Sequence, residues 1–265
     1  HDTVMYTLAG IDNRDWGWGI AGETFAGAEM LERYGEETWF RLGDRDLATH
    51  VVRTARLRRG DRPTEIARDL QRALGVQATI LPMSDSQVRT EVQTDEGWLE
   101  FQDYFVRLHQ EPDVHDLRFR GIEDATATPE VEAALEHAEA IVIAPSNPFV
   151  SVRPILAVAG IEAGLQTARA GGAPVIAVSG IVGGKALKGP ADRMLTSLGH
   201  EASALGVARQ YTGIADVFVL DRVDAELEPP IRALGMETLV TDTIMADDAG
   251  RARLAGEILE VARGR

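Results

Sequence analysis

The chain contains no cysteine, which excludes disulfide bonds, thiolate zinc sites and cysteine nucleophiles from its 265 residues. It is short of positive charge, with 27 Lys and Arg against 42 Asp and Glu and a net charge of −15. Nucleic-acid binders concentrate Lys and Arg to neutralise phosphates, so we expect no nucleic-acid partner, while a small anion in a local basic pocket stays open. No apolar run reaches the length that spans a bilayer and no signal peptide is visible, so we expect a cytoplasmic protein without a membrane partner.

Several well-known catalytic motifs are missing as well. The segment that ends in Gly184-Lys185 is not a Walker A loop, because Ser179 stands where the first glycine belongs and Ala186 replaces the magnesium-binding hydroxyl. No Gly-x-Gly-x-x-Gly fingerprint is present, which removes the main sequence support for a dinucleotide-dependent dehydrogenase. The six histidines show no His-Glu-x-x-His spacing, and no Ser-His-Asp order can be defended. The sequence opens at His1 without an initiating Met or a first strand, as if an N-terminal segment were absent.

The second half of the chain alternates short apolar runs with amphipathic segments. Continuous apolar strands separated by helices are typical of a parallel sheet that is covered on both faces. We therefore predict an α/β fold with a Rossmann-like, mostly parallel sheet and helices on both faces, in which ligands bind beyond the carboxyl ends of the strands. The expected strands are 140–144, 174–178, 217–220 and 238–241, and the expected helices are 155–165, a segment around 194, 231–234 and 247–263.

The first half has a different pattern, with helical periodicity followed by a β-hairpin. We expect a nucleotide-binding core made of residues 1–22 and 76–265, and a smaller, mainly helical lobe at 23–75 that helps to form a substrate pocket. The expected helices of the lobe are 23–34, 46–59 and 63–74, and the hairpin strands are 91–93 and 98–101, separated by Thr94-Asp95-Glu96-Gly97.

The strand at 174–178 runs directly into a loop, residues 179–192, that holds four glycines, two lysines and an aspartate. Glycines let backbone N–H groups approach an anion closely, and lysine adds a mobile point charge suited to phosphate. The alternative is a tight turn whose lysines are merely solvated. The candidate phosphate-binding residues are Gly183, Gly184, Lys185 and Lys188, with Asp192 as a further supporting residue.

A second polar loop, Ala144-Pro145-Ser146-Asn147-Pro148, follows the strand at 140–144 and precedes a helix. Ser146 and Asn147 can offer side-chain hydrogen bonds to a phosphate or a purine edge, and the helix can add N–H groups. A helix-capping turn between two prolines is the alternative reading. Because both loops follow parallel strands, we expect them at the same sheet edge, which favours a nucleotide as ligand.

The N-terminal half adds polar and aromatic candidates. Asp46 is expected to cap a helix, whereas Arg41 and Asp44 have no evident structural role and can line a polar pocket. Asp2 lies in a polar cluster with Thr3 and Tyr6, and a carboxylate that faces a diphosphate can hold Mg²⁺. The Trp16-Gly17-Trp18-Gly19 run could stack on a flat ring or pack as an aromatic loop.

Taken together, these blocks resemble the 2-phospho-L-lactate transferase family (CofD/FbiA-like) of coenzyme F-420 biosynthesis. The resemblance runs in order over nearly the whole chain, and its specificity comes from having eight blocks in register. The matching blocks are 2–8, 16–19, 39–50, Leu81-Pro82-Met83-Ser84-Asp85, Phe101-Gln102-Asp103-Tyr104-Phe105, Pro145-Ser146-Asn147-Pro148, 183–192 and Thr241-Asp242-Thr243.

The resemblance implies a Mg²⁺-dependent transferase that acts as a homodimer. Such an enzyme moves a phospholactyl or phosphoenolpyruvyl group from a guanosine diphosphate ester to the deazaflavin FO and releases GMP, and the sequence does not choose between the two donors. In mechanism, the terminal ribityl hydroxyl of FO attacks the phosphorus, and positioning and charge neutralisation do most of the work.

The resemblance also assigns residues. Asp2 matches the aspartate that contacts FO or the metal and is the candidate catalytic residue; Arg41 matches an FO-binding position, and Asp44 is a further FO candidate. The guanosine diphosphate part is expected at Ser146, Asn147, Gly183, Gly184, Lys185 and Lys188.

The chain departs from the family pattern in two places. It lacks the initial strand with a Gly-Gly-x-Gly-Gly loop and the Gly-Asp-Asp segment that follows, and it has Gly180 where proline is usual. The main rival is a nonenzymatic nucleotide- or nucleotide-sugar-binding regulator of the same fold, which the 39–50 block and Asp2 disfavour because they match an FO pocket. A nicotinamide oxidoreductase ranks below both.

Overall fold

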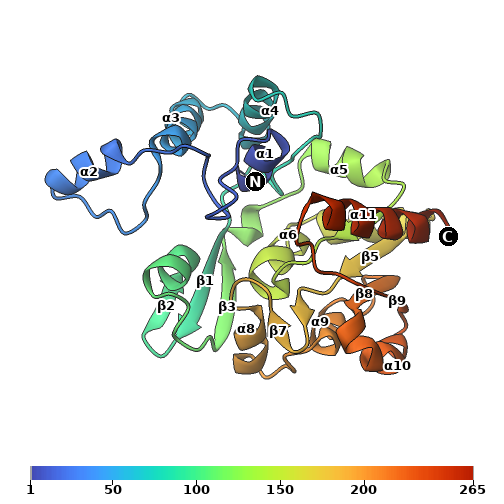
Figure 1. Cartoon of the computed structure of the whole chain (residues 1–265). Helices are drawn as coiled ribbons and strands as arrows, with labels where there is room; N and C mark the ends of the chain where they lie inside the picture. Colours follow the sequence, from blue (N-terminus) through green and yellow to red (C-terminus); the bar gives the residue numbers. More distant parts are fainter. Residues whose placement is uncertain (1, 265) are drawn as a thin grey trace.

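The computed structural model describes residues 2–264 and contains a four-stranded parallel sheet in the order β4-β5-β8-β9 (Figure 1). All three strand pairs are parallel, and the register places Ala177 of β5 between Ile143 of β4 and Phe218 of β8. The Rossmann-like α/β prediction is therefore confirmed. The strands are β4 (Ile141–Ile143), β5 (Val175–Val178), β8 (Val217–Asp221) and β9 (Glu237–Thr241).

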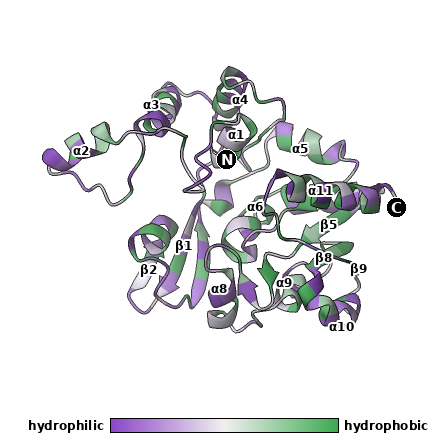
Figure 2. Cartoon of the chain, in the orientation of Figure 1, coloured by the Kyte–Doolittle hydropathy of each residue, from purple (hydrophilic) through white to green (hydrophobic). Residues whose placement is uncertain are grey.

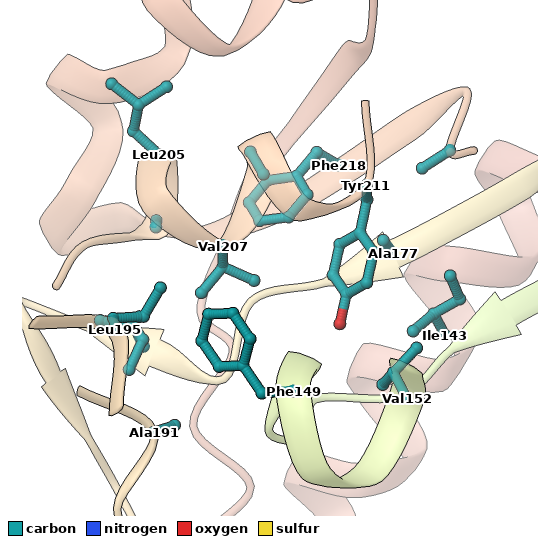
Figure 3. Close-up of a cluster of buried hydrophobic side chains, with 14 of the residues drawn as sticks. Ile143, Phe149, Val152, Ala177, Ala191, Leu195, Leu205, Val207, Tyr211 and Phe218 are labelled. Carbon is teal, nitrogen blue, oxygen red and sulfur yellow. The ribbon is translucent and has the colours of Figure 1, made fainter. Parts of the chain in front are cut away.

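Helices cover both faces of this sheet, as predicted. Because side chains alternate between the faces of a strand, a strand covered on both faces needs apolar residues on both sides; β5 and β8 are buried throughout, and β8 is apolar up to Asp221 at its end. Helix α11 (Asp248–Arg263) packs Leu254 and Ile258 on one face. The other face packs against α7 (Ile161–Ala170), α8 (Ala191–Ser197) and α9 (Ala204–Gln210), and Figure 3 shows part of this cluster.

The sequence joined two separate helices into one at 155–165. The structure has α6 (Arg153–Leu156) and α7, divided where Ala159 forms a parallel bridge with Thr126 and Gly160 takes a φ of +96°. This bridge takes the backbone out of the helix, and a left-handed residue such as Gly160 restarts it with little strain. Several short elements in this half were not predicted, among them α5 (Pro129–Glu136), α9 and the hairpin β6 (Ile181–Val182) and β7 (Lys185–Ala186). Helix α10 (Glu228–Arg232) matches the helix expected near 231.

The predicted hairpin is part of a three-stranded antiparallel sheet in the order β2-β1-β3. Strands β1 (Arg89–Thr94) and β2 (Gly97–Glu100) form the hairpin, and β3 (Asp116–Arg120) was missed. Charges fill β3, yet the buried carboxylate of Glu91 on β1 pairs with Arg118 and Arg120 across the strands. Cross-strand ion pairs thus replace the apolar pattern that would have revealed this strand.

The three predicted helices of the lobe are present as α2 (Ala26–Arg33), α3 (Asp44–Arg58) and α4 (Pro63–Ala73). An unpredicted helix, α1 (Asp2–Leu8), packs Met5 and Tyr6 with Ile20 and the apolar side of α4. Part of the segment before residue 23 thus packs on the helical lobe, while Arg14 of the same segment pairs with Asp248 of α11 at 3.3 Å. The division at residue 22 stays a prediction. Figure 1 shows α2 projecting away from the rest of the chain, and Figure 2 shows that hydrophilic and hydrophobic residues alternate along it. None of the helices within residues 2–264 combines the length and apolar character needed to cross a bilayer.

An arginine at the start of α4 ties the lobe to the body of the molecule. The Arg62 guanidinium donates to Asp85 at 2.6 Å and to both oxygens of Glu130 on α5 at 3.2 and 2.9 Å. We expect Arg62→Met to lower the midpoint urea concentration of unfolding slightly but measurably, because exposed ion pairs contribute modestly even in networks. Urea unfolding measures this loss. The control Arg72→Met changes an exposed arginine 3.8 Å from Asp69, and a loss as large as that of Arg62→Met would contradict this role.

Candidate functional site

The two polar loops that follow β4 and β5 meet at the carboxyl edge of the sheet. A Cβ atom placed on Gly180 would lie 3.4 Å from the Ser146 carbonyl oxygen, so the loops are in close contact. The Ser146 side chain is half-buried, and its hydroxyl has no hydrogen-bond partner within residues 2–264. This contact explains why a small residue stands at 180, and it leaves the Ser146 hydroxyl available to a ligand.

Asn147 has a structural role in this edge. Its Oδ1 accepts hydrogen bonds from the N–H groups of Phe149 at 2.9 Å and Val150 at 3.4 Å, which caps the π-helix η3 (Pro148–Val152). Its Nδ2 lies 3.2 Å from the Met194 sulfur. The helix-capping role that the sequence left open for this loop is therefore present in the structure. A ligand at Asn147 would contact the same side-chain amide that caps η3.

Gly183 and Gly184 form the two-residue turn of the β6–β7 hairpin, with φ angles of +57° and +76°. Two-residue hairpin turns of this kind need positive φ at both central positions, so the hairpin itself requires these glycines. The Gly183 N–H donates to both carboxylate oxygens of Asp224, at 3.1 and 3.0 Å. The expectation that this N–H is open to an anion is therefore wrong for Gly183, because Asp224 already occupies it.

Two buried carboxylates lie near the end of β8, and their environments differ. Burial raises the pKa of Asp224, opposed by the Gly183 N–H and reinforced by the negative charges of Glu226 and Asp221. Burial also acts on Asp221, but the pKa of Asp221 is lowered, because its carboxylate accepts from the N–H groups of Val223 and Thr243 and from the Thr243 hydroxyl. The hydrogen bonds of Asp221 thus favour its ionised form, whereas the surroundings of Asp224 disfavour its ionised form.

These opposite shifts predict opposite pH effects. An Asp with a raised folded pKa binds protons more readily when folded, so Asp224 destabilises the fold as pH rises above about 3.8 toward that raised pKa. An Asp with a lowered pKa stabilises above its unfolded pKa and loses this as pH falls through the folded pKa, which describes Asp221. We compare the free energy of unfolding of each variant with that of the unchanged chain. When the pH falls from about 7 to about 4, we expect this difference to move against Asp224→Asn and in favour of Asp221→Asn. Urea unfolding of both variants at the two pH values checks this, and shifts of the same sign would contradict it.

The two lysines of this region have different surroundings, and they are the only lysines in the sequence. The Lys185 ammonium is 81% exposed and lies 3.6 Å from the Asp192 carboxylate, beside a cavity of about 230 Å³ that both residues line. Lys188 has no ion-pair partner among the described residues, and its Nζ lies 3.3 Å from the position of a Cβ on Gly17. Lys188 therefore connects the loop after β5 with the N-terminal Trp16-Gly17-Trp18 segment.

An aromatic cluster made of Trp16, Trp18 and Phe25 lies next to this contact. The ring centroids of Trp16 and Trp18 are 5.3 Å apart, and those of Trp16 and Phe25 are 5.7 Å apart. The Arg41 guanidinium stacks over Phe25 at 4.6 Å and, like Lys188, has no carboxylate partner within residues 2–264. The aromatic cluster and the Gly17 between its tryptophans thus have two uncompensated cations nearby, Lys188 and Arg41, in a chain with a net charge of −15.

Asp2 begins α1 and lies against α3. Its carboxylate forms an ion pair with both terminal nitrogens of Arg53, one of them at 2.9 Å, and lies 4.0 Å from the His50 Nε2. Asp46 was expected to cap α3, but this is wrong, because Gly43 stands at the N-cap. Asp46 instead lies inside the first turn, where its buried carboxylate accepts from the Tyr6 hydroxyl at 2.7 Å.

Asp44 also has a structural role that the sequence did not reveal. Its carboxylate accepts from the Thr24 hydroxyl and from the N–H groups of Ala26 at 3.1 Å and Gly27 at 2.9 Å, at the start of α2. These hydrogen bonds, chiefly that from Thr24, lower the pKa of Asp44. In return, Glu23 accepts from the first N–H groups of α3, at Arg45 and Asp46. Asp44 of α3 therefore binds the start of α2, and Glu23, just before α2, binds the start of α3. These reciprocal hydrogen bonds hold the starts of the two helices together.

Within residues 2–264, no group of three or more His, Asp or Glu side chains is arranged to hold a metal ion. A magnesium site in this protein would therefore need most of its ligands from a substrate, as is common for Mg²⁺ bound with phosphates. Sequence reasoning also missed Asp224, Arg53 and Phe25. Each of these residues contacts a residue that is distant along the chain, so no local sequence motif predicts its role.

A parallel sheet with helices on both faces, and two polar loops meeting at its carboxyl edge, define a Rossmann-like α/β protein with a candidate ligand site at that edge. The model of one protein family, 2-phospho-L-lactate transferase CofD, matches residues 1–253. The chain belongs to this family.

Two curated relatives agree with this membership, and a solved structure agrees with the fold. The chain is 37% identical over 260 residues to the 2-phospho-L-lactate transferase of Methanosarcina mazei, covering 98% of this chain and 84% of that one. It is 40% identical over 274 residues to the phosphoenolpyruvate transferase of Mycobacterium avium, covering 98% and 79%. A crystal structure of a UPF0052 family member from Bacillus halodurans superposes with a TM-score of 0.55 at 14% identity, covering 95% and 81%, which supports the fold alone.

Proposed function

We propose that this chain transfers a phospholactyl or phosphoenolpyruvyl group from a guanosine diphosphate ester to the deazaflavin FO. The products are F-420-0 or dehydro-F-420-0 and GMP. Family membership and the names of the relatives support a transferase of this kind. The observation that carries the proposal is the position of Lys188, an uncompensated cation between the loops at the sheet edge and the aromatic cluster.

The donor is proposed to lie along the carboxyl edge of the sheet. The free hydroxyl of Ser146 and the amide of Asn147 would contact its guanosine part, while Gly184, Lys185 and Lys188 lie toward the diphosphate. Gly183 would support this site through its bond to Asp224. Ammonium groups neutralise the charge that develops on the transferred phosphoryl group and on the leaving GMP.

The acceptor is proposed to lie at the aromatic cluster. Trp16 and Trp18 are 46% and 43% exposed, so their rings remain available to stack on the flat deazaflavin, with Arg41 beside Phe25 at the same surface. In the reaction, the terminal ribityl hydroxyl oxygen attacks the phosphorus that bears the lactyl or enolpyruvyl group. The new P–O bond forms, the bond to GMP breaks, and the hydroxyl proton passes to a base, for which Asp2 is the candidate.

We also propose that Mg²⁺ accompanies the diphosphate, with Asp2 as its protein ligand. One carboxylate together with substrate phosphates is a common arrangement for this ion. The bound ion would neutralise phosphate charge. The Asp2 carboxylate is paired with Arg53, so it would bind both the Arg53 guanidinium and the Mg²⁺ ion.

The proposal is tested by measuring GMP release from each guanosine diphosphate ester with and without FO, using chromatography. We expect release that depends on FO, stops when a chelator removes the metal, and returns with Mg²⁺. Release that proceeds equally without FO would show a hydrolase rather than a transferase. Binding of the donor without any release would indicate a nucleotide-binding regulator.

A further inference from the structure

A second cavity lies between the segment that follows β4, which includes Pro148 at the end of the second polar loop, and the end of α9. It measures about 300 Å³, a volume typical of small-molecule sites, and is bordered by η3, α6, the start of α7 and the turn after α9. Its walls are apolar on one part, with Val152, Leu156 and Ile214, and polar on another, with Arg153, Glu162 and Gln210. None of the residues proposed for the donor or for FO lines it, so this inference does not rest on the proposed function.

One wall of the cavity carries a buried hydroxyl without a partner. Tyr211 is 2% exposed, burial raises its pKa, and its hydroxyl makes no hydrogen bond within residues 2–264. In the described chain every fully enclosed side-chain polar atom has a partner, so the Tyr211 hydroxyl is not fully enclosed, and Tyr211 lines the cavity. Figure 3 shows it pointing toward Val152, which lines the same cavity. A buried hydroxyl in this position needs a hydrogen-bonding partner, and a ligand can supply it.

Two opposite charges stand at the border of the cavity. Arg153 begins α6 and Glu162 lies in the first turn of α7; both line the cavity, and both are exposed. Within residues 2–264 neither side chain has an ion-pair partner, so they do not neutralise each other. A guanidinium binds a carboxylate well and a carboxylate binds an ammonium, so this pair matches a zwitterion.

The helix at the cavity supports a binding role. Pro148 and Val152 belong to η3, whose backbone is π-helical rather than α-helical. The π-helix is rare in proteins, and its single turns occur frequently at functional sites. Asn147 caps this turn, so its form is held in place by a dedicated side chain.

We propose that this cavity binds a small α-amino acid with an aromatic side chain that ends in a hydroxyl group. The carboxylate of the ligand pairs with Arg153 and its ammonium with Glu162, while the ring lies against the apolar walls. The Tyr211 hydroxyl meets the polar end of the side chain. A site built to hydrogen-bond a hydroxyl discriminates against the analogue that lacks it, so L-tyrosine binds more tightly than L-phenylalanine.

Isothermal titration calorimetry of the full chain with L-tyrosine, up to its solubility limit, tests this site. We expect saturable binding, weakened at least about tenfold for L-phenylalanine, for tyramine, which lacks the carboxylate, and for 3-(4-hydroxyphenyl)propanoate, which lacks the ammonium. Arg153→Gln is expected to weaken L-tyrosine by a similar factor. Tyr211→Phe is expected to weaken L-tyrosine but to leave L-phenylalanine unchanged.

The control is Arg209→Gln, an exposed arginine on α9 that pairs with Glu201 and lies outside the cavity, and it is expected to bind L-tyrosine normally. Absence of binding by L-tyrosine would overturn the proposal, as would equal binding of tyramine or of the propanoate. Binding that Arg153→Gln leaves intact would place the ligand elsewhere and would also overturn it. Since Arg153 is exposed, its replacement tests the site without threatening the fold.

Discussion

Replacing Lys188 with alanine is expected to lower kcat/KM for the transfer by about 100-fold, because a charge-assisted bond to phosphate contributes about 3 kcal/mol. Lys188 has no ion-pair partner in the described chain and reaches the N-terminal aromatic segment at Gly17. Its charge is therefore free to act on the diphosphate at the point where donor and acceptor would meet. Steady-state kinetics with varied donor and saturating FO measure the loss.

Lys185→Ala is the matched comparison, since Lys185 is the one other lysine in the sequence. Asp192 lies 3.6 Å from its ammonium and water surrounds it, so we expect a loss of less than about tenfold. Because the chain has two lysine side chains, acylation of amines followed by mass spectrometry gives an independent readout. Bound donor is expected to protect Lys188 more than Lys185. Equal kinetic losses and equal labelling would contradict the position assigned to Lys188.

Asp2→Asn is expected to lower kcat by about 100-fold or more, as removal of a catalytic carboxylate does when it acts in the transition state. The substitution also breaks the ion pair with Arg53, which by itself changes stability. Arg53→Gln breaks the same pair and keeps the Asp2 carboxylate, so it separates the two effects. We expect Arg53→Gln to lower the free energy of unfolding while retaining kcat within about tenfold.

The outcome of this pair decides what Asp2 does. A fall in kcat in Asp2→Asn alone assigns the carboxylate to the reaction. Equal falls in both variants would show that the ion pair positions α1 on α3 and that Asp2 has no chemical role. Measuring kcat at several Mg²⁺ concentrations adds a readout that a structural role would not move, because loss of a metal ligand raises the Mg²⁺ concentration needed for half-maximal rate.

The parallel sheet could be predicted because its information is local. Runs such as Val175–Val178 are apolar at every position, and only a strand buried on both faces needs that pattern. The contact between Gly180 and Ser146 follows from the same rule, since parallel strands direct their following loops to one edge. The sequence therefore located the edge at which the site lies.

The roles of individual side chains at that edge could not be predicted, because they depend on contacts between distant residues. Gly183 and Asp224 are separated by 41 positions, and no spacing links them. From the sequence, Asp44 looks like a residue that lines a pocket, because nothing near it in the chain indicates that it binds the N–H groups at the start of α2. In the same way, the ion pairs of Glu91 hide β3 from an apolar pattern, and the Ala159 bridge divides a helix that the periodicity joins.

Mass spectrometry of the deazaflavin product tests the proposed function most directly. Purified protein, Mg²⁺ and FO are incubated with the lactyl and the enolpyruvyl guanosine diphosphate esters, first separately and then in competition. The account predicts FO whose mass is increased by a phospholactyl or a phosphoenolpyruvyl group, formed in an amount equal to the GMP released. Unmodified FO with both donors, under conditions in which the donor binds, would contradict it.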